Sequence, residues 1–203
     1  MKVTLIKHPT EDDWWEVKRR ALVTIGKKPV LQPHAGWKHA ILEARHSPIR
    51  YLMYSFLIEG IPSNTATHLV RHHVGAQPYV SSLRNDRQDR MDGDKAPRDT
   101  PVDMIVDINA EAMMIWANKR LCMQAAPRTR QVVQMMCRQV EDTDPEAWAG
   151  LLVPACVHQG GVCHEMKPCG RNTHEPQGTT GAGQSNTGVS AQHDAGRPAQ
   201  SAD

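Results

Sequence analysis

Residues 71–84 read RHHVGAQPYVSSLR, the densest group of polar side chains in the chain. The three basic residues that open it are expected to end a helix, and Ser82 and Arg84 follow on a short extended stretch. Side chains two residues apart share one face of a strand, so Ser82 and Arg84 point the same way. Arginine presents forked donors that match phosphate or carbonyl groups. The stretch therefore suits an anionic ligand with a planar polar ring, or equally a helix end whose carbonyl dipole is complemented by cationic side chains.

The hydrophobic pattern around this stretch predicts a mixture of strands and helices. Strands are expected at residues 2–7 and 50–58, with a short extended segment at 79–83. Helices are expected at residues 12–22, 36–45, 62–72, 103–123 and 128–140, and a polar surface loop at 85–101. The strongest helical signal is an apolar stripe made by Met104, Ile108, Ala112, Ile115 and Trp116. Because strands and helices alternate without a β-α-β rhythm, the expected fold class is α+β.

Charge and hydrophobicity exclude several classes of protein. The chain of 203 residues has 24 Lys and Arg against 22 Asp and Glu, a net charge of +2. That near balance argues against a module that binds nucleic acid by bulk charge. No apolar run approaches the roughly 20 residues of a membrane span, and the N-terminus has no signal-peptide core. We expect a cytoplasmic protein that binds neither membrane nor nucleic acid.

Composition divides the chain into two parts. Residues 171–203 are dominated by Gly, Thr, Gln, Ser, Asn and Ala, and Val189 is the one large aliphatic side chain among them. Such a segment cannot bury enough apolar surface to offset the entropy lost on ordering. The sequence therefore predicts a folded domain at residues 1–170 and a disordered low-complexity tail at 171–203.

The cysteines allow two interpretations. The chain has 5, an odd number, and no export signal, which argues against a disulfide framework. Cys122, Cys156, Cys163 and Cys169 could bind a structural zinc that pins the C-terminal segment to the predicted 103–123 helix. Their spacing is looser than in paired C-x-x-C motifs, so buried or free thiols are the alternative. Cys137 is expected to be a core residue of a helix.

The stretch at 71–84 resembles the signature of flavin-dependent thymidylate synthases. That signature is Arg-His-Arg, seven residues, then Ser, with an Arg two positions after the Ser. Here the seven-residue spacing leads to Ser81, whereas the Ser-x-Arg pair is Ser82 and Arg84, as if the intervening loop carried one extra residue. His73 stands in place of the third-position Arg.

Two further blocks extend the resemblance over about residues 36–135. Upstream, Arg45-His46-Ser47-Pro48 looks like the family segment in which a hydroxyl residue before the Pro contacts the flavin. Downstream, Asn109 and Arg120 match the family's Asn-rich helix and its later Arg. Glu111 replaces the usual basic residue, and Ile115 replaces a second flavin-contacting Asn.

The resemblance implies a fold of mixed helices around a small antiparallel sheet. It also implies an FAD-dependent methyltransferase that reductively methylates dUMP to dTMP. Methylenetetrahydrofolate would be the carbon donor and NADPH the reductant. The assembly would be a homotetramer with active sites between subunits, in which the His/Arg and Asn/Arg blocks meet across chains.

The family's site residues carry over position by position. Arg120 matches the catalytic Arg, whose charge stabilises the N3 anion of the uracil ring. The nucleotide would be bound by His68, Arg71, Val80, Ser81, Ser82, Arg84 and Arg120. The FAD would be bound by Ser47, Arg71, His72, His73 and Asn109. Asn109 and Arg120 are 11 residues apart, so on one helix they would share a face.

Two other functions compete with this one. A degenerate relative would keep the fold and bind nucleotide or flavin without turnover, in line with His73, Glu111 and Ile115. A zinc-binding interaction module could instead be built on the C-terminal cysteines. Bound flavin would distinguish the first two functions from the third, and dTMP formation would distinguish the first from the second.

Overall fold

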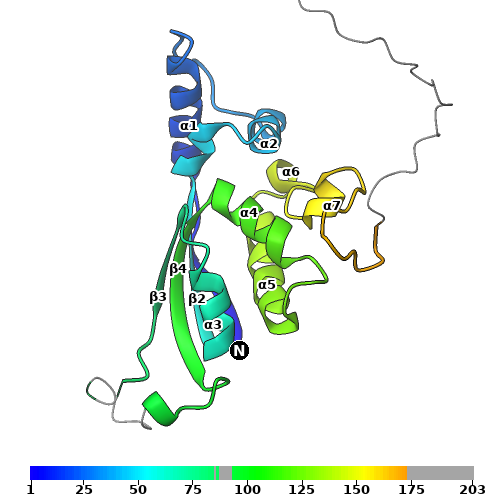
Figure 1. Ribbon diagram of the computed structural model, residues 1–203. Coiled ribbons are helices and arrows are strands. Elements are labelled where there is room, and N and C mark those ends of the chain that lie inside the picture. The colour runs from blue at the N-terminus through cyan, green and yellow to red at the C-terminus, as the bar shows by residue number, and fades with distance from the viewer. Residues whose placement is uncertain (85, 87–92, 173–203) are drawn as a thin grey trace, which may run out of the picture.

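The computed structural model describes residues 1–84, 86 and 93–172 (Figure 1). Its strands form an antiparallel sheet in the order β1-β2-β4-β3. The strands are β1 (Lys2–Lys7), β2 (Met53–Pro62), β3 (Ala76–Val80) and β4 (Pro101–Asn109). The helices are α1 (Glu11–Val23), α2 (Ala35–Glu43), α3 (Ser63–Val70), α4 (Ala110–Arg120), α5 (Pro127–Thr143), α6 (Pro145–Trp148) and α7 (Ala155–His158). Two 3-10 helices are η1 (Ser47–Tyr51) and η2 (Gly93–Lys95).

The core lies between one face of the sheet and the helices. In Figure 1, α3, α4 and α5 lie on the same side of the sheet, and α1 extends past the sheet's end. From α5, Val132, Val133, Met136 and Val140 are fully buried. Trp148 donates from Nε1 to the Tyr54 hydroxyl at 3.1 Å, which satisfies two polar groups inside the core. The α+β class and the small antiparallel sheet are confirmed.

The predicted helix at residues 103–123 is wrong in its first part. Residues 101–109 form β4, and the helix α4 begins only at Ala110. Along β4 the buried residues alternate with exposed ones, Val102, Met104, Val106 and Ile108 facing the core. A run rich in β-branched Val and Ile that alternates with a period of two favours a strand. The prediction was wrong because Met104 and Ile108, four residues apart, fit the helical period as well as the strand period. Ile115, assigned to the helical stripe, is 37% exposed.

The other predicted elements agree with the structure to within a few residues. Strand 2–7 and helices 12–22, 36–45 and 128–140 correspond to β1, α1, α2 and α5. The predicted strand at 50–58 is β2 shifted toward the C-terminus, and the helix predicted at 62–72 is the shorter α3. The predicted loop at 85–101 falls partly, and the predicted tail almost wholly, outside the described residues.

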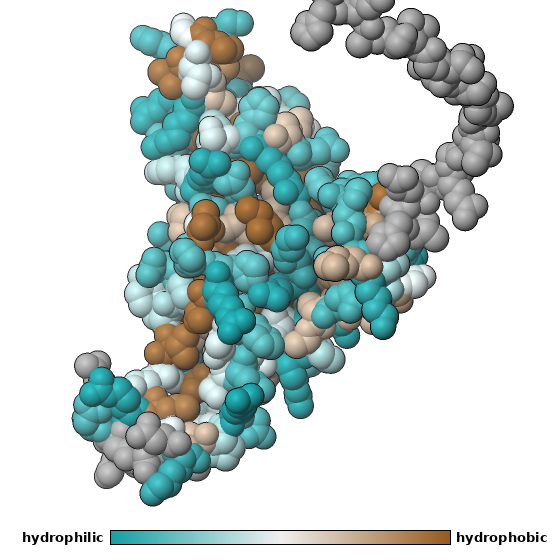
Figure 2. Space-filling model, in the orientation of Figure 1, coloured by the Kyte–Doolittle hydropathy of each residue, from teal (hydrophilic) through white to brown (hydrophobic). Residues whose placement is uncertain are grey.

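Exposed apolar side chains lie close to one another at two places, among others in the described chain. One is the tip of the α1 arm, where Val23, Ile25, Val30 and Leu31 are between 61% and 85% exposed (Figure 2). The other is the sheet face opposite the core, where Tyr79 pairs with Ile105 and Ile105 pairs with Leu57. No helix within residues 1–84 and 93–172 is long and apolar enough to cross a bilayer.

Candidate functional site

Arg120 is the last residue of α4, and its guanidinium is half-buried. Its Nη2 donates to the backbone carbonyl of His68 at 3.0 Å, while its buried Nε has no partner. Burial and then the charge of Arg71 lower the pKa of Arg120. Among the described residues no carboxylate pairs with this guanidinium. A partly desolvated cation without a counter-charge is a position at which an anionic ligand would be stabilised.

The α3 helix brings the first basic block to Arg120. His68 lies in its last turn and Arg71 is its C-cap, so both are near the Arg120 side chain within one chain. The His68 ring is held by a 3.1 Å hydrogen bond between its Nδ1 and the Thr129 hydroxyl of α5. These residues of the two blocks therefore already meet within one chain, because α3 and α4 both pack against α5. The expected meeting of the blocks across chains stays a prediction.

An open cleft of about 360 Å³ adjoins this cluster and contains no acidic residue in its lining. Its walls are formed by Ser63, Asn64, Thr67, His68, Arg71 and Arg98. Three hydrogen bonds join the loop that contains Arg98 to the start of α3. In one of them the backbone N–H of Asn64 donates to the Arg98 carbonyl at 2.9 Å. Arg71 and His68 were predicted from the sequence, whereas Asn64 and Thr67 were missed, although their spacing from Arg71 places the three on neighbouring turns of one helix face. Arg98 comes from a loop and has no such periodic signal.

His72 and Trp116 form a second group of unpartnered polar atoms. The Nε2 atom of His72 and the Nε1 atom of Trp116 are buried and have no hydrogen-bond partner, and the two ring centroids are 6.1 Å apart. Burial, followed by the charges of Arg120 and Lys119, lowers the pKa of His72. Its ring is therefore neutral near pH 7. His73 is exposed beside it.

Asn109 joins this group to the end of the sheet. It is the N-cap of α4, and its Oδ1 accepts from Ala112 N at 2.8 Å. Its own N–H donates to the Gly75 carbonyl at 2.9 Å. Because Asn109 and Arg120 are at opposite ends of α4, about 16 Å of helix separates them. The two residues are not both inside the helix as predicted, since Asn109 is the N-cap and Arg120 the last helical residue, and their shared face stays a prediction.

Glu111 has a local role that the sequence comparison did not indicate. Its carboxylate accepts from Arg50 Nε at 2.6 Å and from Arg50 Nη2 at 3.2 Å. Arg50 belongs to η1, which Ser47 begins, and Ser47 is exposed. The acidic residue therefore holds a cation beside Ser47, at the end of α4 where Asn109 lies. Arg50 was missed because its partner is 61 positions away.

The second half of the polar stretch lies at the far end of β3. Strand β3 separates it from His73 by about 17 Å, at about 3.3 Å per residue. Ser81 continues the ladder with Asp103, and the Ser82 hydroxyl accepts from Arg84 N at 3.2 Å. Arg84 is exposed and makes two bonds to Asp86, at 2.9 and 2.6 Å, and Val80 is 39% exposed. Within one chain, Ser82 and Arg84 are not part of the cluster around Arg120.

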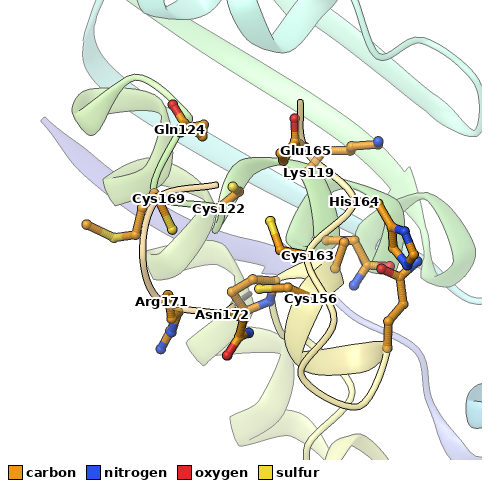
Figure 3. Close-up of a pocket in the computed structure, with 15 residues that line it drawn as sticks. Lys119, Cys122, Gln124, Cys156, Cys163, His164, Glu165, Cys169, Arg171 and Asn172 are labelled. Carbon is orange, nitrogen blue, oxygen red and sulfur yellow. The ribbon is translucent and has the colours of Figure 1, made fainter. Parts of the chain in front are cut away.

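Four cysteines face one cavity of about 120 Å³ on the other side of α4 (Figure 3). They are Cys122, Cys156, Cys163 and Cys169, the four proposed from the sequence as metal ligands. All are free thiols. In residues 1–84, 86 and 93–172, no group of three or more His, Cys, Asp or Glu side chains has an arrangement that could hold a metal ion. Cys137 is buried in α5, which raises the pKa of its thiol, as expected for a core residue.

The residues around the two ends of α4, Asn109 at its start and Arg120 at its finish, fit the ligands that the resemblance implies. The cleft offers arginines and hydroxyls to a phosphate or a pyrimidine carbonyl. The other end offers His72 Nε2, Trp116 Nε1 and the Asn109 amide, which suit the ring nitrogens and carbonyls of a flavin. The arrangement is a basic surface with polar atoms that no residue of the described chain satisfies.

Comparison with known proteins places this arrangement in a known fold. No family model and no curated protein matches the sequence. Two structures of thymidylate synthase X (ThyX) from Helicobacter pylori with FAD and dUMP match this fold. The first has a TM-score of 0.58 and 15% identity and covers 75% of this chain and 99% of its own. The second has a TM-score of 0.59 and 14% identity and covers 74% of this chain and 99% of its own. The UMP/dUMP methylase PolB from Streptomyces cacaoi, bound with 5-Br dUMP, matches at a TM-score of 0.58 and 17% identity, covering 75% of this chain and 96% of its own. The chain therefore has the fold of these ThyX and PolB structures.

Proposed function

We propose that the chain is a flavin-dependent thymidylate synthase that methylates dUMP to dTMP. The observation that carries the proposal is the half-buried Arg120 guanidinium, which has an orphaned Nε and lies behind two residues of an acid-free cleft: it donates to the His68 carbonyl and is close to Arg71. The same fold in ThyX and PolB structures that contain dUMP or its bromo analogue supports it. By resemblance, methylenetetrahydrofolate is the carbon donor, NADPH the reductant and FAD the bound cofactor.

Arg120 would act on the uracil ring. Uracil N3–H is a weak acid, and a fixed guanidinium beside it stabilises the N3 anion. A close opposite charge shifts a pKa by roughly 1–3 units. Because Arg120 is anchored to a neutral carbonyl, its charge is not offset by a carboxylate and remains available to the ring. As negative charge develops on the pyrimidine, the donors are already in place, which is electrostatic preorganisation.

Arg71 and Arg98 are proposed to hold the nucleotide's phosphate, and Ser63 and Thr67 to bind its sugar or carbonyl oxygens. The FAD, when bound, would supply hydride chemistry and mediate transfer of the one-carbon unit. His72, Trp116 and Asn109 would orient it by hydrogen bonds, with Ser47, His73 and Arg50 at its exposed edge. A neutral His72 can donate one hydrogen bond and accept another, which a protonated ring cannot.

A second copy of the chain is proposed to complete each site. Ser82 and Arg84 belong to the signature, yet they lie about 17 Å from His73 within the chain. The exposed apolar residues of the α1 tip and of the open sheet face would be covered in such an assembly. We infer the homotetramer of the resembled family, in which Ser82 and Arg84 reach the cleft of a neighbour.

The test is a spectrum of the purified protein followed by activity measurements. We expect the absorption bands of oxidised flavin, their perturbation on titration with dUMP, and dTMP formation coupled to NADPH oxidation. Arg120→Ala should keep the flavin and reduce turnover by at least about a hundredfold, the loss typical of one electrostatic donor. Arg138→Ala, which removes an exposed arginine of α5, is the matched control. Flavin and dUMP binding without any dTMP would instead indicate a relative that has lost turnover.

A further inference from the structure

We propose that Cys122, Cys156, Cys163 and Cys169 form a structural zinc site. All four line one cavity, although they come from three separate parts of the chain. Cys122 follows α4, Cys156 lies in α7, and Cys163 and Cys169 lie in the segment after α7. Figure 3 shows their side chains around the same space. The remaining cysteine, Cys137, is inside α5 and takes no part.

The segment after α7 needs an anchor other than apolar packing. Residues 159–172 contain no helix or strand, and of their side chains Cys163 alone is buried, at 5% exposure. Met166, the largest apolar residue there, is 102% exposed. One side-chain hydrogen bond, from Gln124 Nε2 to the Lys167 carbonyl at 2.8 Å, ties the segment to the turn after α4. A segment with so little buried apolar area is held in small domains by a metal or by cross-links.

The chemistry of the lining selects zinc among the common metals. Four thiolates suit a tetrahedral, redox-inactive and borderline-soft ion. The resulting cluster carries a net negative charge, and Lys119 and Arg171 of the same lining outnumber its one carboxylate, Glu165.

Binding requires the loop to close on the ion. Zn–S bonds of about 2.3 Å put the four sulfurs about 3.8 Å apart, and the thiols of the described residues are not yet so arranged. Gly160, Gly161 and Gly170 flank the two loop cysteines and have φ of 68°, 92° and 85°. Glycine at these positions lets the backbone move without a Cβ penalty. We infer that zinc draws Cys163 and Cys169 toward Cys122 and Cys156.

The experiment measures metal on the full chain. Protein purified under reducing conditions and reconstituted with Zn²⁺ should contain one zinc per chain by elemental analysis. Replacement by Co²⁺ should give the strong visible bands of a tetrahedral thiolate site, at longer wavelength than flavin absorption. Limited proteolysis should cleave residues 159–172 at least about tenfold faster after chelation.

Variants separate the metal site from general folding. Cys169 is exposed, so Cys169→Ser should fold, yet it should weaken zinc affinity by at least about tenfold and reduce the thiolate bands of the cobalt spectrum, because three of the four sulfurs remain. Cys137→Ala is the matched control and should keep the zinc. Reconstituted protein without zinc, unchanged affinity in Cys169→Ser and Cys156→Ser, or iron with sulfide in place of zinc would each overturn the proposal. Arg120→Ala should keep the metal, so the outcome is independent of the proposed enzyme function.

Discussion

Replacing Gly75 by alanine should destabilise the protein by about 2–3 kcal/mol. Gly75 has a φ of +73°, and holding a residue with a Cβ in this region costs about 1 kcal/mol or more. A Cβ here would lie 2.7 Å from Asn109 Nδ2 and 3.0 Å from the Ala112 Cβ. The Asn109 side chain cannot turn away freely because its Oδ1 caps α4. Loss of that cap adds about 1 kcal/mol.

Gly150→Ala provides a matched control. Its φ is +70°, but nothing lies within 4 Å of the added Cβ, so the conformational cost alone remains, about 1 kcal/mol. Thermal unfolding at equal chain concentration should show a fall in Tm of about 5–10 °C for Gly75→Ala and about 2–4 °C for Gly150→Ala. In an Asn109→Ala background the cost of Gly75→Ala should shrink, since the crowded amide is gone.

The result that would refute this reasoning is an equal fall in Tm for the two glycine variants. It would mean that the turn before β3 and the start of α4 are not in contact. A change confined to Gly75→Ala, together with weaker flavin retention, would instead connect this contact with the cofactor end of the site.

Three further perturbations test other parts of the structure. His72→Gln should flatten the pH dependence of stability, measured by equilibrium urea unfolding at several pH values. Because the pKa of His72 is lowered in the folded state, the unfolded chain binds more protons below about pH 6.5. The wild-type protein therefore loses stability as the pH falls below that value, and the variant should lose less. Val106→Ala should cost about 2 kcal/mol and Ile105→Ala under about 1, because only Val106 faces the core; equal costs would contradict the strand assignment. Arg50→Ala should change the free energy of unfolding by under about 0.5 kcal/mol, because its ion pair with Glu111 is exposed and weak. The same variant should lower flavin affinity several-fold, and an unchanged affinity would remove Arg50 from the cofactor site.

The sequence was most informative where one periodicity held along an element. The helix α5 keeps one apolar face over its length, and it was predicted. Residues 103–109 were misread because Met104 and Ile108 fit a helix as well as a strand. The switch to a helix is made by one side chain, Asn109, whose cap bond becomes visible only in three dimensions.

For the candidate site, the individual residues were easier to predict than their grouping. Arg120 and His68 were identified, but their contact within one chain depends on α3 and α4 both packing on α5. The pairing of Arg50 with Glu111 spans 61 positions and leaves no local pattern. Arg84 was assigned to the same ligand site, yet its distance from that site in one chain depends on the direction of β3.

The attachment of Arg120 to a main-chain carbonyl has a kinetic consequence. An incoming anion need not displace a bound carboxylate before it reaches the guanidinium. The positive field of Arg71 and Arg98 extends out through the open cleft, and Arg120 adds to it from beside Arg71. Capture of a negatively charged ligand should therefore be rapid at low ionic strength. Its association rate should fall steeply as added salt shortens the Debye length toward about 8 Å, while its dissociation rate changes far less.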